Sequence, residues 1–543
     1  MKIIKKMNVI PKVLAGLGVL LLASCSSGPN NLNVIPKEAK VVSVIDFYSI
    51  IKKGKLYDIK DFNLFNVFTK EARKADKGLV KLSNEIIDDP GITGISLTSD
   101  FFVYYLNEAE DESFSVISAE LNSDSKFEDF IKHVLKKTGG DLEIEDGSTY
   151  KYTIMGRDVA MAWDSDKVVF LTALNRASRP HMDIEIEALF ELSESEQITS
   201  NEDFNTFYNK KKDISVWMST NLYENSYQYK MLMQQADFDI SDSYASAHLD
   251  FEDESVSLLT EFTPNEEVQK MMSEHNIFEH EMNTDLLEFF PSENLATASM
   301  SISPSAYYSL IKKQGEFEKV EAEFKRETGF EFKEIVESIE GSAVVSVFGF
   351  KEVEYTYETE GYGRSVEVSR NEYLPQIGLA FDINGNRVLK DMLDNMPEGA
   401  INKLNNYYQF TFDRKFPAYL AFNDKVCYIS NDLESIAAFN NGGGSGDDLS
   451  DSDVSSAIES SNFYTYLNLN YESYPKEIKK RIKSSQNGME KKLFKIWNEI
   501  AKSMELKSIE TNSVEFIFNT KDSGSNSLSV IFKAIDENYQ LFL

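Results

Sequence analysis

The sequence predicts an α+β fold made of two tandem duplicated modules, each with antiparallel sheets packed by helices. Two observations favour this fold. Segments of the first half of the chain recur in the second half at a nearly constant offset, and runs of short strands are followed by single amphipathic helices. Hydrophobic residues make up 42% of the chain and aromatic residues 12%, a composition that can bury sizeable cores.

Four pairs of matching segments indicate the duplication. Their offsets lie between 248 and 260 residues, so that small insertions bring them into one register. The matches are Pro36 with Pro291, YSIIKK at Tyr48 with YSLIKK at Tyr308, DKVVFL at Asp166 with DKVCYI at Asp424, and Tyr223-Glu224 with Tyr471-Glu472. We therefore expect one module over residues 34–282 and a second over residues 283–543.

Equivalent elements are expected in the two modules. Each opens with a strand that runs into an amphipathic helix, over residues 39–47 and 295–303, and a further strand is expected at 93–97 and at 343–348. Three short strands follow later in each module. The Gly-rich and Ser-rich stretch NNGGGSGDDLSDSDVSS predicts a flexible loop over residues 440–456.

The first residues have the pattern of a signal peptide. Lys2, Lys5, Lys6 and Lys12 accompany no acidic residue, and an apolar run extends from Val13 to Ala23. That run is shorter than the about 20 residues that a bilayer-spanning helix needs. We therefore expect residues 1–24 to be removed as a signal peptide.

Leu22-Ala23-Ser24-Cys25 resembles the lipobox of bacterial lipoproteins. The resemblance implies that Cys25 becomes a lipidated N-terminus, carrying acyl chains such as palmitate. One chain alone anchors a protein only marginally, so two or three would be needed for durable attachment. The following residues, SSGPNN, favour turns over regular structure, and residues 25–33 are therefore expected to form a short flexible tether.

The first module opens with Ile35-Pro36-Lys37-Glu38-Ala39, followed by the apolar run from Val41 to Asp46. Together with the lipobox and the tether, this opening resembles large envelope lipoproteins of Bacteroidota of the domain of unknown function 4836 type. The resemblance implies an outer-membrane lipoprotein and supplies no catalytic residue. Family members at the cell surface often carry acids just after the lipidated cysteine, whereas the first acid here is Glu38. We therefore expect first that the protein faces the periplasm, and second that it is displayed at the cell surface.

The charge balance limits the partners. The chain has 56 Lys plus Arg and 89 Asp plus Glu, a formal net charge of −33. Such a body would be repelled by phosphate backbones and by anionic lipid surfaces, so no nucleic-acid partner is expected. The expected partners are the membrane, through the lipid anchor, and an envelope protein or glycan.

A serine acyl-transfer site has weak support. Ser49-x-x-Lys52 recurs as Ser309-x-x-Lys312, and Lys137-Thr138-Gly139 supplies the KTG of penicillin-recognising enzymes. However, Gly139 ends a helical pattern, where it suits a C-cap, and the second module lacks the triplet. An amphipathic helix whose Ser and Lys face water is the favoured interpretation.

Metal sites are also weakly supported, and no cofactor is expected. His275 and His280, with Glu274, Glu279 and Glu281 nearby, are five residues apart and would point about 140° apart on a helix. Gly443-Gly444-Ser445-Gly446-Asp447-Asp448 fits one repeat of a calcium-binding β-roll, but those rolls stack many repeats. A flexible linker is favoured, and weak calcium binding by Asp447, Asp448, Asp451 and Asp453 stays open.

Cys427 matches Val169 in the repeat and is expected to be a small buried hydrophobe. Trp163, Trp217 and Trp497, and the tyrosine-rich runs NLYENSYQY and NFYTYLNLNYESY, could line a sugar or peptide groove. Packing in cores or across strands is the favoured role of these aromatic residues.

The favoured function is a non-catalytic binding or scaffold lipoprotein of the cell envelope. One alternative is an envelope hydrolase or glycan-processing enzyme that uses carboxylates, and another is a calcium-tuned surface adhesin. Apart from lipidation at Cys25, the sequence assigns no catalytic, cofactor or metal-binding residue.

Overall fold

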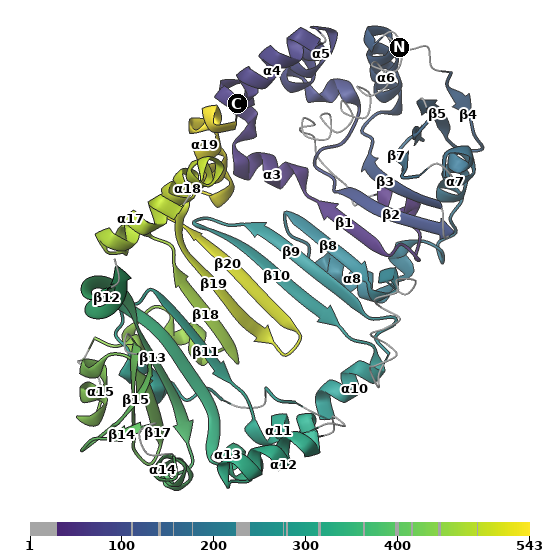
Figure 1. Cartoon of the computed structure of the whole chain (residues 1–543). Coiled ribbons are helices and arrows are strands. Elements are labelled where there is room, and N and C mark those ends of the chain that lie inside the picture. Colours follow the sequence, from purple (N-terminus) through teal and green to yellow (C-terminus); the bar gives the residue numbers. More distant parts are fainter. Residues whose placement is uncertain are drawn as a thin grey trace. The chain divides into compact units, whose positions relative to one another are not determined.

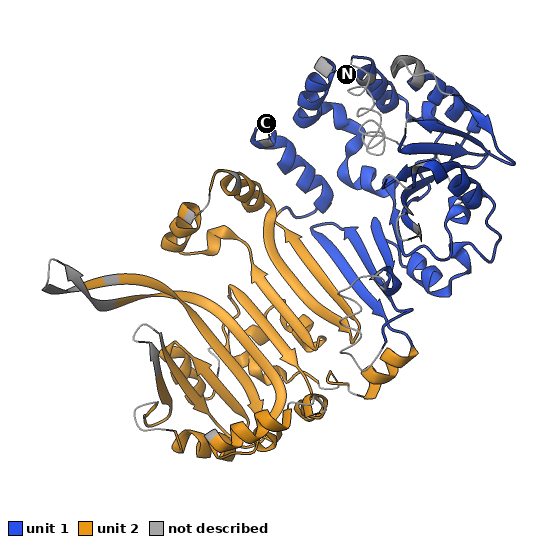
Figure 2. Cartoon of the chain, turned by 45° about the vertical axis from the view of Figure 1, so that its right-hand side comes forward, with its two compact units in different colours: residues 1–265, 522–543 blue, residues 266–521 orange. Residues whose placement is uncertain are grey.

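The computed structural model describes residues 30–542 apart from residues 76, 110–111, 139–142, 156, 176–177, 224–238, 275, 279–280, 313–316, 362–363, 397–400, 414–415, 444–446 and 486. The chain forms two compact units (Figure 2). Unit 1 comprises residues up to 265 together with residues 522–543, and unit 2 comprises residues 266–521. The two units are defined by contacts between residues. The module boundaries expected from the sequence repeat, residues 34–282 and 283–543, stay a prediction.

Unit 1 contains an antiparallel sheet whose strands pair in the order β4-β5-β6-β7-β3-β2-β1-β8-β9-β10 (Figure 1). The strands are β1 (Val41–Ile45), β2 (Phe101–Ala109), β3 (Glu112–Glu120), β4 (Glu145–Asp146), β5 (Lys151–Met155), β6 (Val159–Trp163), β7 (Lys167–Ala173), β8 (Ile214–Ser219), β9 (Tyr244–Phe251) and β10 (Ser255–Thr263).

Two hydrophobic cores cover parts of this sheet. The helices of unit 1 are α3 (Phe47–Gly54), α4 (Asn63–Ala75), α5 (Lys77–Asp88), α6 (Asp124–Thr138), α7 (Met182–Phe190), α8 (Glu202–Asn209) and α19 (Ser527–Glu537), with 3-10 turns η1 (Asn30–Val34), η2 (Leu56–Asp61), η3 (Pro90–Thr93), η4 (Arg179–His181), η5 (Ile198–Ser200), η6 (Thr220–Tyr223) and η10 (Tyr539–Phe542). In one core, side chains of η1, α7 and α8 pack against the strands. In the other core, side chains of α5 and α6 pack against them. Alternate strand residues point to opposite faces, so the sheet contributes side chains to both.

Unit 2 contains a second antiparallel sheet, with strands in the order β14-β15-β16-β17-β13-β12-β11-β18-β19-β20. The strands are β11 (Ala296–Ser301), β12 (Ile339–Gly361), β13 (Arg364–Ile383), β14 (Ile401–Lys403), β15 (Tyr408–Asp413), β16 (Phe416–Phe422), β17 (Val426–Ser430), β18 (Phe463–Asn468), β19 (Ala501–Glu510) and β20 (Ser513–Thr520). Each strand thus occupies the place of the strand ten numbers below it in unit 1.

Helices also cover both faces of the second sheet. They are α10 (Glu266–Glu274), α11 (Pro304–Lys312), α12 (Phe317–Thr328), α13 (Phe332–Glu337), α14 (Arg387–Asp394), α15 (Leu433–Asn440), α16 (Ser455–Glu459), α17 (Lys476–Ser485) and α18 (Gly488–Ile500), with η7 (Thr284–Phe289), η8 (Leu449–Asp451) and η9 (Tyr471–Ser473). One core packs η7, α15, η8 and α16 against the sheet, and the smaller one packs α14. The predicted α+β class with antiparallel sheets packed by helices is therefore confirmed.

Residues 522–543 belong to unit 1 because α19 packs against α3 and α4. Gly54 allows this approach, since a Cβ atom there would lie 2.7 Å from the ring of Phe532. The Leu64 amide donates a hydrogen bond of 2.8 Å to the Asp536 carboxylate, and the Asn526 side chain donates one of 2.6 Å to the Phe251 carbonyl. The last helix thus completes a unit that begins at the other end of the chain.

Three sequence-based expectations need correction. The described end of the predicted tether is packed, because Asn30–Val34 forms η1 and the side chains of Asn31 and Leu32 are buried. The strand expected at residues 93–97 is wrong, because η3 lies there and Ile95 forms only an isolated bridge, whereas β2 begins at Phe101.

The predicted loop at residues 440–456 is also more ordered than expected in its described part. It contains η8 and the start of α16, and Leu449 is fully buried in the core. Leu449, together with the partly buried Val454, thus packs this Gly-rich and Ser-rich stretch against the core of unit 2.

A charged cluster joins α3 to the residue before β8 and to β9 in unit 1. The Lys53 ammonium lies 2.7 Å from the carboxylate of Asp213 and 2.6 Å from that of Asp250. Burial opposes the charge of Lys53, but the hydrogen bonds to both carboxylates outweigh burial and raise its pKa. Burial raises the pKa of Asp250, but hydrogen bonds from Lys53 and Lys212 outweigh it and leave the pKa lowered.

We expect Lys53→Met to destabilise unit 1 by about 2 kcal/mol, because the Asp213 carboxylate, 2% exposed, loses its cation. The matched control is Lys52→Met, since Lys52 is exposed on the same helix. Chemical denaturation measures both variants. Since the pKa of Asp250 is lowered, the stabilisation is present above its ordinary value of 3.8 and is lost as the pH falls below it. Equal stability of the two variants at neutral pH would contradict the assignment.

Candidate functional site

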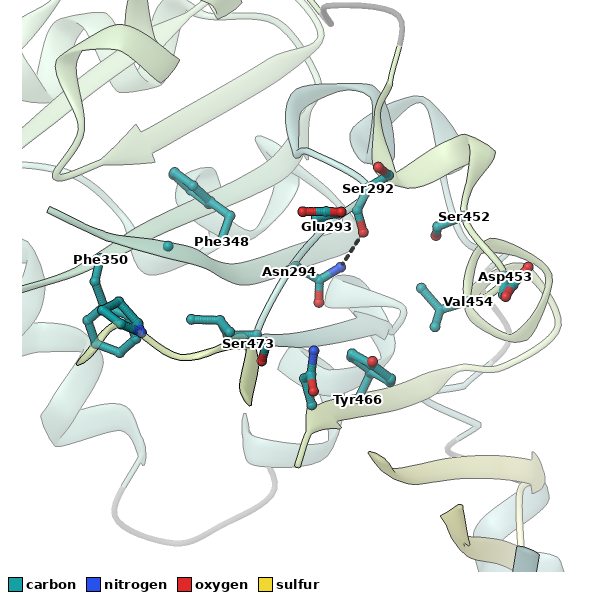
Figure 3. A pocket seen from close by; sticks show the side chains of 14 residues that line it. Ser292, Glu293, Asn294, Phe348, Phe350, Ser452, Asp453, Val454, Tyr466 and Ser473 are labelled. Atoms are coloured by element: carbon teal, nitrogen blue, oxygen red, sulfur yellow. Dashed lines mark hydrogen bonds between the residues drawn. The ribbon is translucent and has the colours of Figure 1, made fainter. Parts of the chain in front are cut away.

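A hollow of about 490 Å³ lies in unit 2 beside the start of β11 (Figure 3). We call it the β11 hollow. Its lining residues come from the segment before β11, from β12, from the turn between η8 and α16, from β18, and from the end of η9 with the residues after it: Ser292, Glu293, Asn294, Leu295, Phe348, Gly349, Phe350, Ser452, Asp453, Val454, Tyr466, Asn468, Ser473 and Pro475.

The first wall is the segment before β11, which the Asp-rich stretch holds in place. Pro291 forms an isolated bridge with Asp448, and the Ser292 amide donates a hydrogen bond of 3.2 Å to the Asp447 carbonyl. The Ser292 hydroxyl donates to the Asp447 carboxylate. The Asn294 side chain donates a hydrogen bond of 3.1 Å to the Ser292 carbonyl, as Figure 3 shows. These contacts fix the backbone at the mouth of the hollow.

The second wall is a β-bulge in β12. The register of β12 with β13 shifts between Val347 and Gly349, so that the strand bends there. A Cβ atom at Gly349 would lie 2.7 Å from the side-chain oxygen of Gln376, and the missing side chain therefore relieves crowding at the bulge. Phe348 and Phe350 flank this glycine and both line the hollow.

The third wall is formed by β18 and the turn that follows it. Tyr466 and Asn468 line the hollow from β18, and the Tyr474 hydroxyl donates a hydrogen bond of 2.8 Å to the Asn468 carbonyl. The ring centroids of Phe350 and Tyr474 lie 6.3 Å apart. Burial, with the nearby charge of Glu505, raises the pKa of Tyr466, so its phenol is neutral at physiological pH.

The lining chemistry suits binding of a neutral or cationic polar group. Aromatic rings, amides and hydroxyls dominate, and Glu293 and Asp453 are exposed. Among the described lining residues none is His, Lys, Arg or Cys.

The structure brings together one of the aromatic runs that the sequence singled out. The run NFYTYLNLNYESY supplies Tyr466, Asn468 and Ser473 to the hollow, whereas Tyr464 and Tyr471 in the same run are buried. One part of this run thus lines the hollow and another part packs in the core, whereas binding of a sugar or peptide by the run stays a prediction. Phe348 and Phe350 were missed, because a bulge in a long strand leaves no local sequence signal beyond Gly349.

The residues of the acyl-transfer motif are not assembled. The Ser49 hydroxyl donates a hydrogen bond of 2.5 Å to the Asp213 carboxylate, while Lys52 is exposed. The Ser309 hydroxyl donates to the Ser305 carbonyl on its own helix. Gly139 of the KTG triplet lies outside the described residues. Ser49 is therefore part of the charged cluster at Lys53, not the water-facing residue that was expected.

The proposed metal residues fall into two groups. His275, Glu279 and His280 lie outside the described residues, as do Cys25 and residues 444–446. Asp448 accepts hydrogen bonds from the amide and hydroxyl of Ser450 and caps η8. Within the part of the chain that the structure describes, no group of three or more His, Cys, Asp or Glu is arranged to hold a metal ion.

Two tryptophans have the predicted packing role. Trp163 and Trp217 are each 2% exposed, and Trp163 contacts Phe127 edge to face at 5.5 Å between centroids. Trp497 is 40% exposed, although its ring lies 5.0 Å from that of Phe518. The packing prediction is thus confirmed for two of the three.

The prediction for Cys427 is confirmed. The side chain is fully buried in the smaller core of unit 2, and burial raises the pKa of its thiol to about 12. The thiol therefore stays protonated at neutral pH.

Comparisons with known proteins give a family without an assigned role. The family model described as "Domain of unknown function (DUF4836)" matches residues 31–528. No curated protein matches the chain. Crystal form III of TP0453 shows 10% identity, covering 46% of this chain and 87% of that chain with a TM-score of 0.25. Crystal form I of TP0453 shows 7% identity, with coverage of 48% and 89% and a TM-score of 0.24.

Among the helices formed by the described residues, none combines the length and apolar character needed to cross a membrane.

We expect the native protein carrying Cys25→Ser, with Cys427 as its remaining thiol, to react with a thiol reagent at pH 8 at least about 100-fold more slowly than the unfolded protein. The raised pKa and the burial both suppress the thiolate. Absorbance of the released reagent measures the rate with and without denaturant, and comparable rates in the two states would contradict the burial of Cys427.

Proposed function

Because the chain belongs to the family described as domain of unknown function DUF4836, whose description names no activity, we propose its function from the sequence and the site. The protein is a lipid-anchored, non-catalytic binding protein of the bacterial cell envelope. Its β11 hollow receives a neutral or cationic group of an envelope protein or glycan.

The lipid anchor rests on the sequence. A short apolar run after four lysines, followed by Leu22-Ala23-Ser24-Cys25, supports export and lipidation at Cys25. The absence of acids before Glu38 favours attachment to the outer membrane on its periplasmic side. Together these features define where the hollow would meet its ligand.

The single observation that carries the binding role is the lining of the β11 hollow. Phe348, Phe350 and Tyr466 present apolar and aromatic surface beside the amide of Asn468, a combination typical of ligand sites. The carboxylates of Glu293 and Asp453 disfavour anions. A ligand with hydroxyl, amide or ammonium groups fits this chemistry.

We further infer that the two units descend from one duplicated module. The strands of the two units pair in the same order, and the four sequence matches at offsets of 248 to 260 residues fall on equivalent elements. Such a protein would present two related surfaces, and the β11 hollow belongs to the second copy.

We expect the wild-type protein to incorporate a fatty-acid analogue in cells and to stay in the outer-membrane fraction, whereas Cys25→Ala incorporates none and is released from that fraction. Metabolic labelling and membrane fractionation measure these effects. A periplasm-facing protein also resists protease added to intact cells. Labelling of the Cys25→Ala variant would contradict lipidation at this residue, and digestion on intact cells would favour the surface-adhesin alternative.

We expect a photoreactive amino acid at Phe350 to crosslink a discrete envelope partner in cells. The same amino acid at Tyr307, which is 45% exposed in the same unit but outside the hollow, serves as the control. Tyr466→Ala should reduce the Phe350 crosslink at least about 10-fold, because one lost hydrogen bond and aromatic contact amount to about 1.5 kcal/mol or more. Immunoblotting and mass spectrometry identify the products.

Equal crosslinking from Phe350 and Tyr307 would contradict a role of the hollow in binding. Turnover of envelope glycans or peptides by the purified protein, abolished by one substitution of a carboxylate, would contradict the non-catalytic role and favour the hydrolase alternative.

A further inference from the structure

A second hollow of unit 2, of about 440 Å³, is lined by η9 and by the helices α17 and α18, which lie next to each other in Figure 1. We call it the lysine hollow. Its lining residues are Tyr471, Glu472, Lys483, Lys491, Phe494, Lys495 and Asn498, and none of these described residues lines the β11 hollow. Its volume lies in the range of small-molecule sites, which is about 300 to 1,000 Å³.

One face of α18 forms a wall of the lysine hollow. The four lining residues of this helix follow the i, i+3, i+4, i+7 pattern and fall within about 100° of the helix circumference: Lys491, Phe494, Lys495 and Asn498. Ile496 and Ile500 lie on another side of α18, where they are buried and fix the helix on unit 2. Two ammonium groups, an aromatic ring and an amide are therefore presented together.

Aromatic rings form the inner part of the lysine hollow. The rings of Tyr471 and Phe494 meet edge to face with their centroids 5.2 Å apart, and Tyr471 is buried. The ammonium group of Lys483, from α17, lies 5.5 Å from the centroid of the Tyr471 ring. Cation–π contact with this ring holds the charge of Lys483 at the hollow. Apolar carbon and positive charge thus lie side by side.

The one carboxylate of the described lining has a cation of its own. The Glu472 carboxylate lies 2.9 Å from the ammonium group of Lys479, which is not a lining residue. The hydrogen bond from Lys479, together with the charges of nearby lysines, lowers the pKa of Glu472. Glu472 is therefore ionised at neutral pH, and its charge is compensated first by Lys479.

The three lining lysines are compensated only in part. Lys495 lies 4.0 Å from the carboxylate of Glu499. Among the described residues, no carboxylate forms an ion pair with Lys483 or with Lys491. The chain as a whole has 89 acidic and 56 basic residues, so its lysines rarely lack a nearby acid. The lysine hollow therefore attracts an anion, in contrast to the β11 hollow.

The amide of Asn498 gives the lysine hollow a further polar group. Its side-chain oxygen is buried and has no hydrogen-bond partner among the described residues. Buried polar atoms are ordinarily hydrogen-bonded. A ligand hydroxyl can donate to the oxygen of this amide or accept from its nitrogen, so it suits either orientation of the side chain.

We propose that the lysine hollow binds a phosphorylated sugar. The phosphate contacts the ammonium groups of Lys483, Lys491 and Lys495, the sugar ring packs over Phe494, and a hydroxyl group bonds to Asn498. Lysine is a frequent partner of phosphate in proteins, and a doubly charged oxyanion gains more than a carboxylate from several ammonium groups. The proposal goes beyond the binding role of the β11 hollow and does not depend on it.

The test titrates the full-length protein in detergent with glucose 6-phosphate, with glucose and with inorganic phosphate, and isothermal titration calorimetry measures binding. The first probe supplies phosphate and sugar together, and the other two supply each part alone. We expect glucose 6-phosphate to bind at least about 10-fold more tightly than inorganic phosphate, because the ring contact and one hydrogen bond are added. Glucose alone should show no measurable binding.

The double variant Lys483→Gln, Lys491→Gln should weaken binding of glucose 6-phosphate at least about 25-fold, since each lost charge-assisted hydrogen bond costs about fivefold or more. The control double Lys476→Gln, Lys480→Gln removes two exposed lysines of α17 that do not line the hollow, and binding should stay unchanged. Asn498→Leu should weaken binding of glucose 6-phosphate about fivefold and leave that of inorganic phosphate unchanged.

No binding of glucose 6-phosphate at millimolar concentration would overturn the proposal. Equal affinities for glucose 6-phosphate and inorganic phosphate would do the same, because the sugar would then have no contact. Equal losses in the two double variants would show that the net charge of α17 and α18, and not the hollow, attracts the anion. The comparison of the three probes uses the wild-type protein, so misfolding of a variant cannot decide the result.

Discussion

The pairing of one early strand between two later ones is the constraint on which each unit depends. In unit 1, β1 pairs with β2 on one side and β8 on the other, and in unit 2, β11 pairs in the same way with β12 and β18. The end of β1 meets the start of β8, which places Asp213 beside Lys53. The start of β11 meets β12 and the end of β18, and the β11 hollow forms at that junction. Both polar features thus follow from strand order.

Much of this order could be predicted from local pattern. The opening strands, the three short strands of each module and the buried role of Cys427 follow from apolar alternation and from the repeat. A strand was expected at residues 93–97 instead of at β2, because apolar and polar residues alternate in that segment too. Only the pairing with β1 distinguishes β2 from it. Asn31 and Leu449 are buried although they lie in stretches of turn-forming residues. The composition of such stretches predicts a flexible loop, and it does not show which individual side chains are packed. Of the hollow, the tyrosine-rich run signalled one wall, whereas the bulge at Gly349 depends on a partner strand distant in sequence.

The net charge of the whole chain bears on its solubility, but it does not give the charge of each local surface. A net charge of −33 predicts repulsion from anionic surfaces, but residues 476–500, which form α17 and α18, hold eight basic and three acidic residues and have a local net charge of +5. The β11 hollow of the same unit carries carboxylates instead. Unit 2 therefore presents surfaces of opposite charge, although the chain as a whole is strongly acidic.

The packing of α19 in unit 1 also determines how early unit 1 can finish folding. The contact between Leu64 and Asp536 spans 472 residues, so a chain emerging from the ribosome must make all of unit 2 before unit 1 can close. At about 5 to 20 residues per second, that delay is roughly 10 to 50 s. Throughout it, the face of α3 that later receives Phe532 stays uncovered.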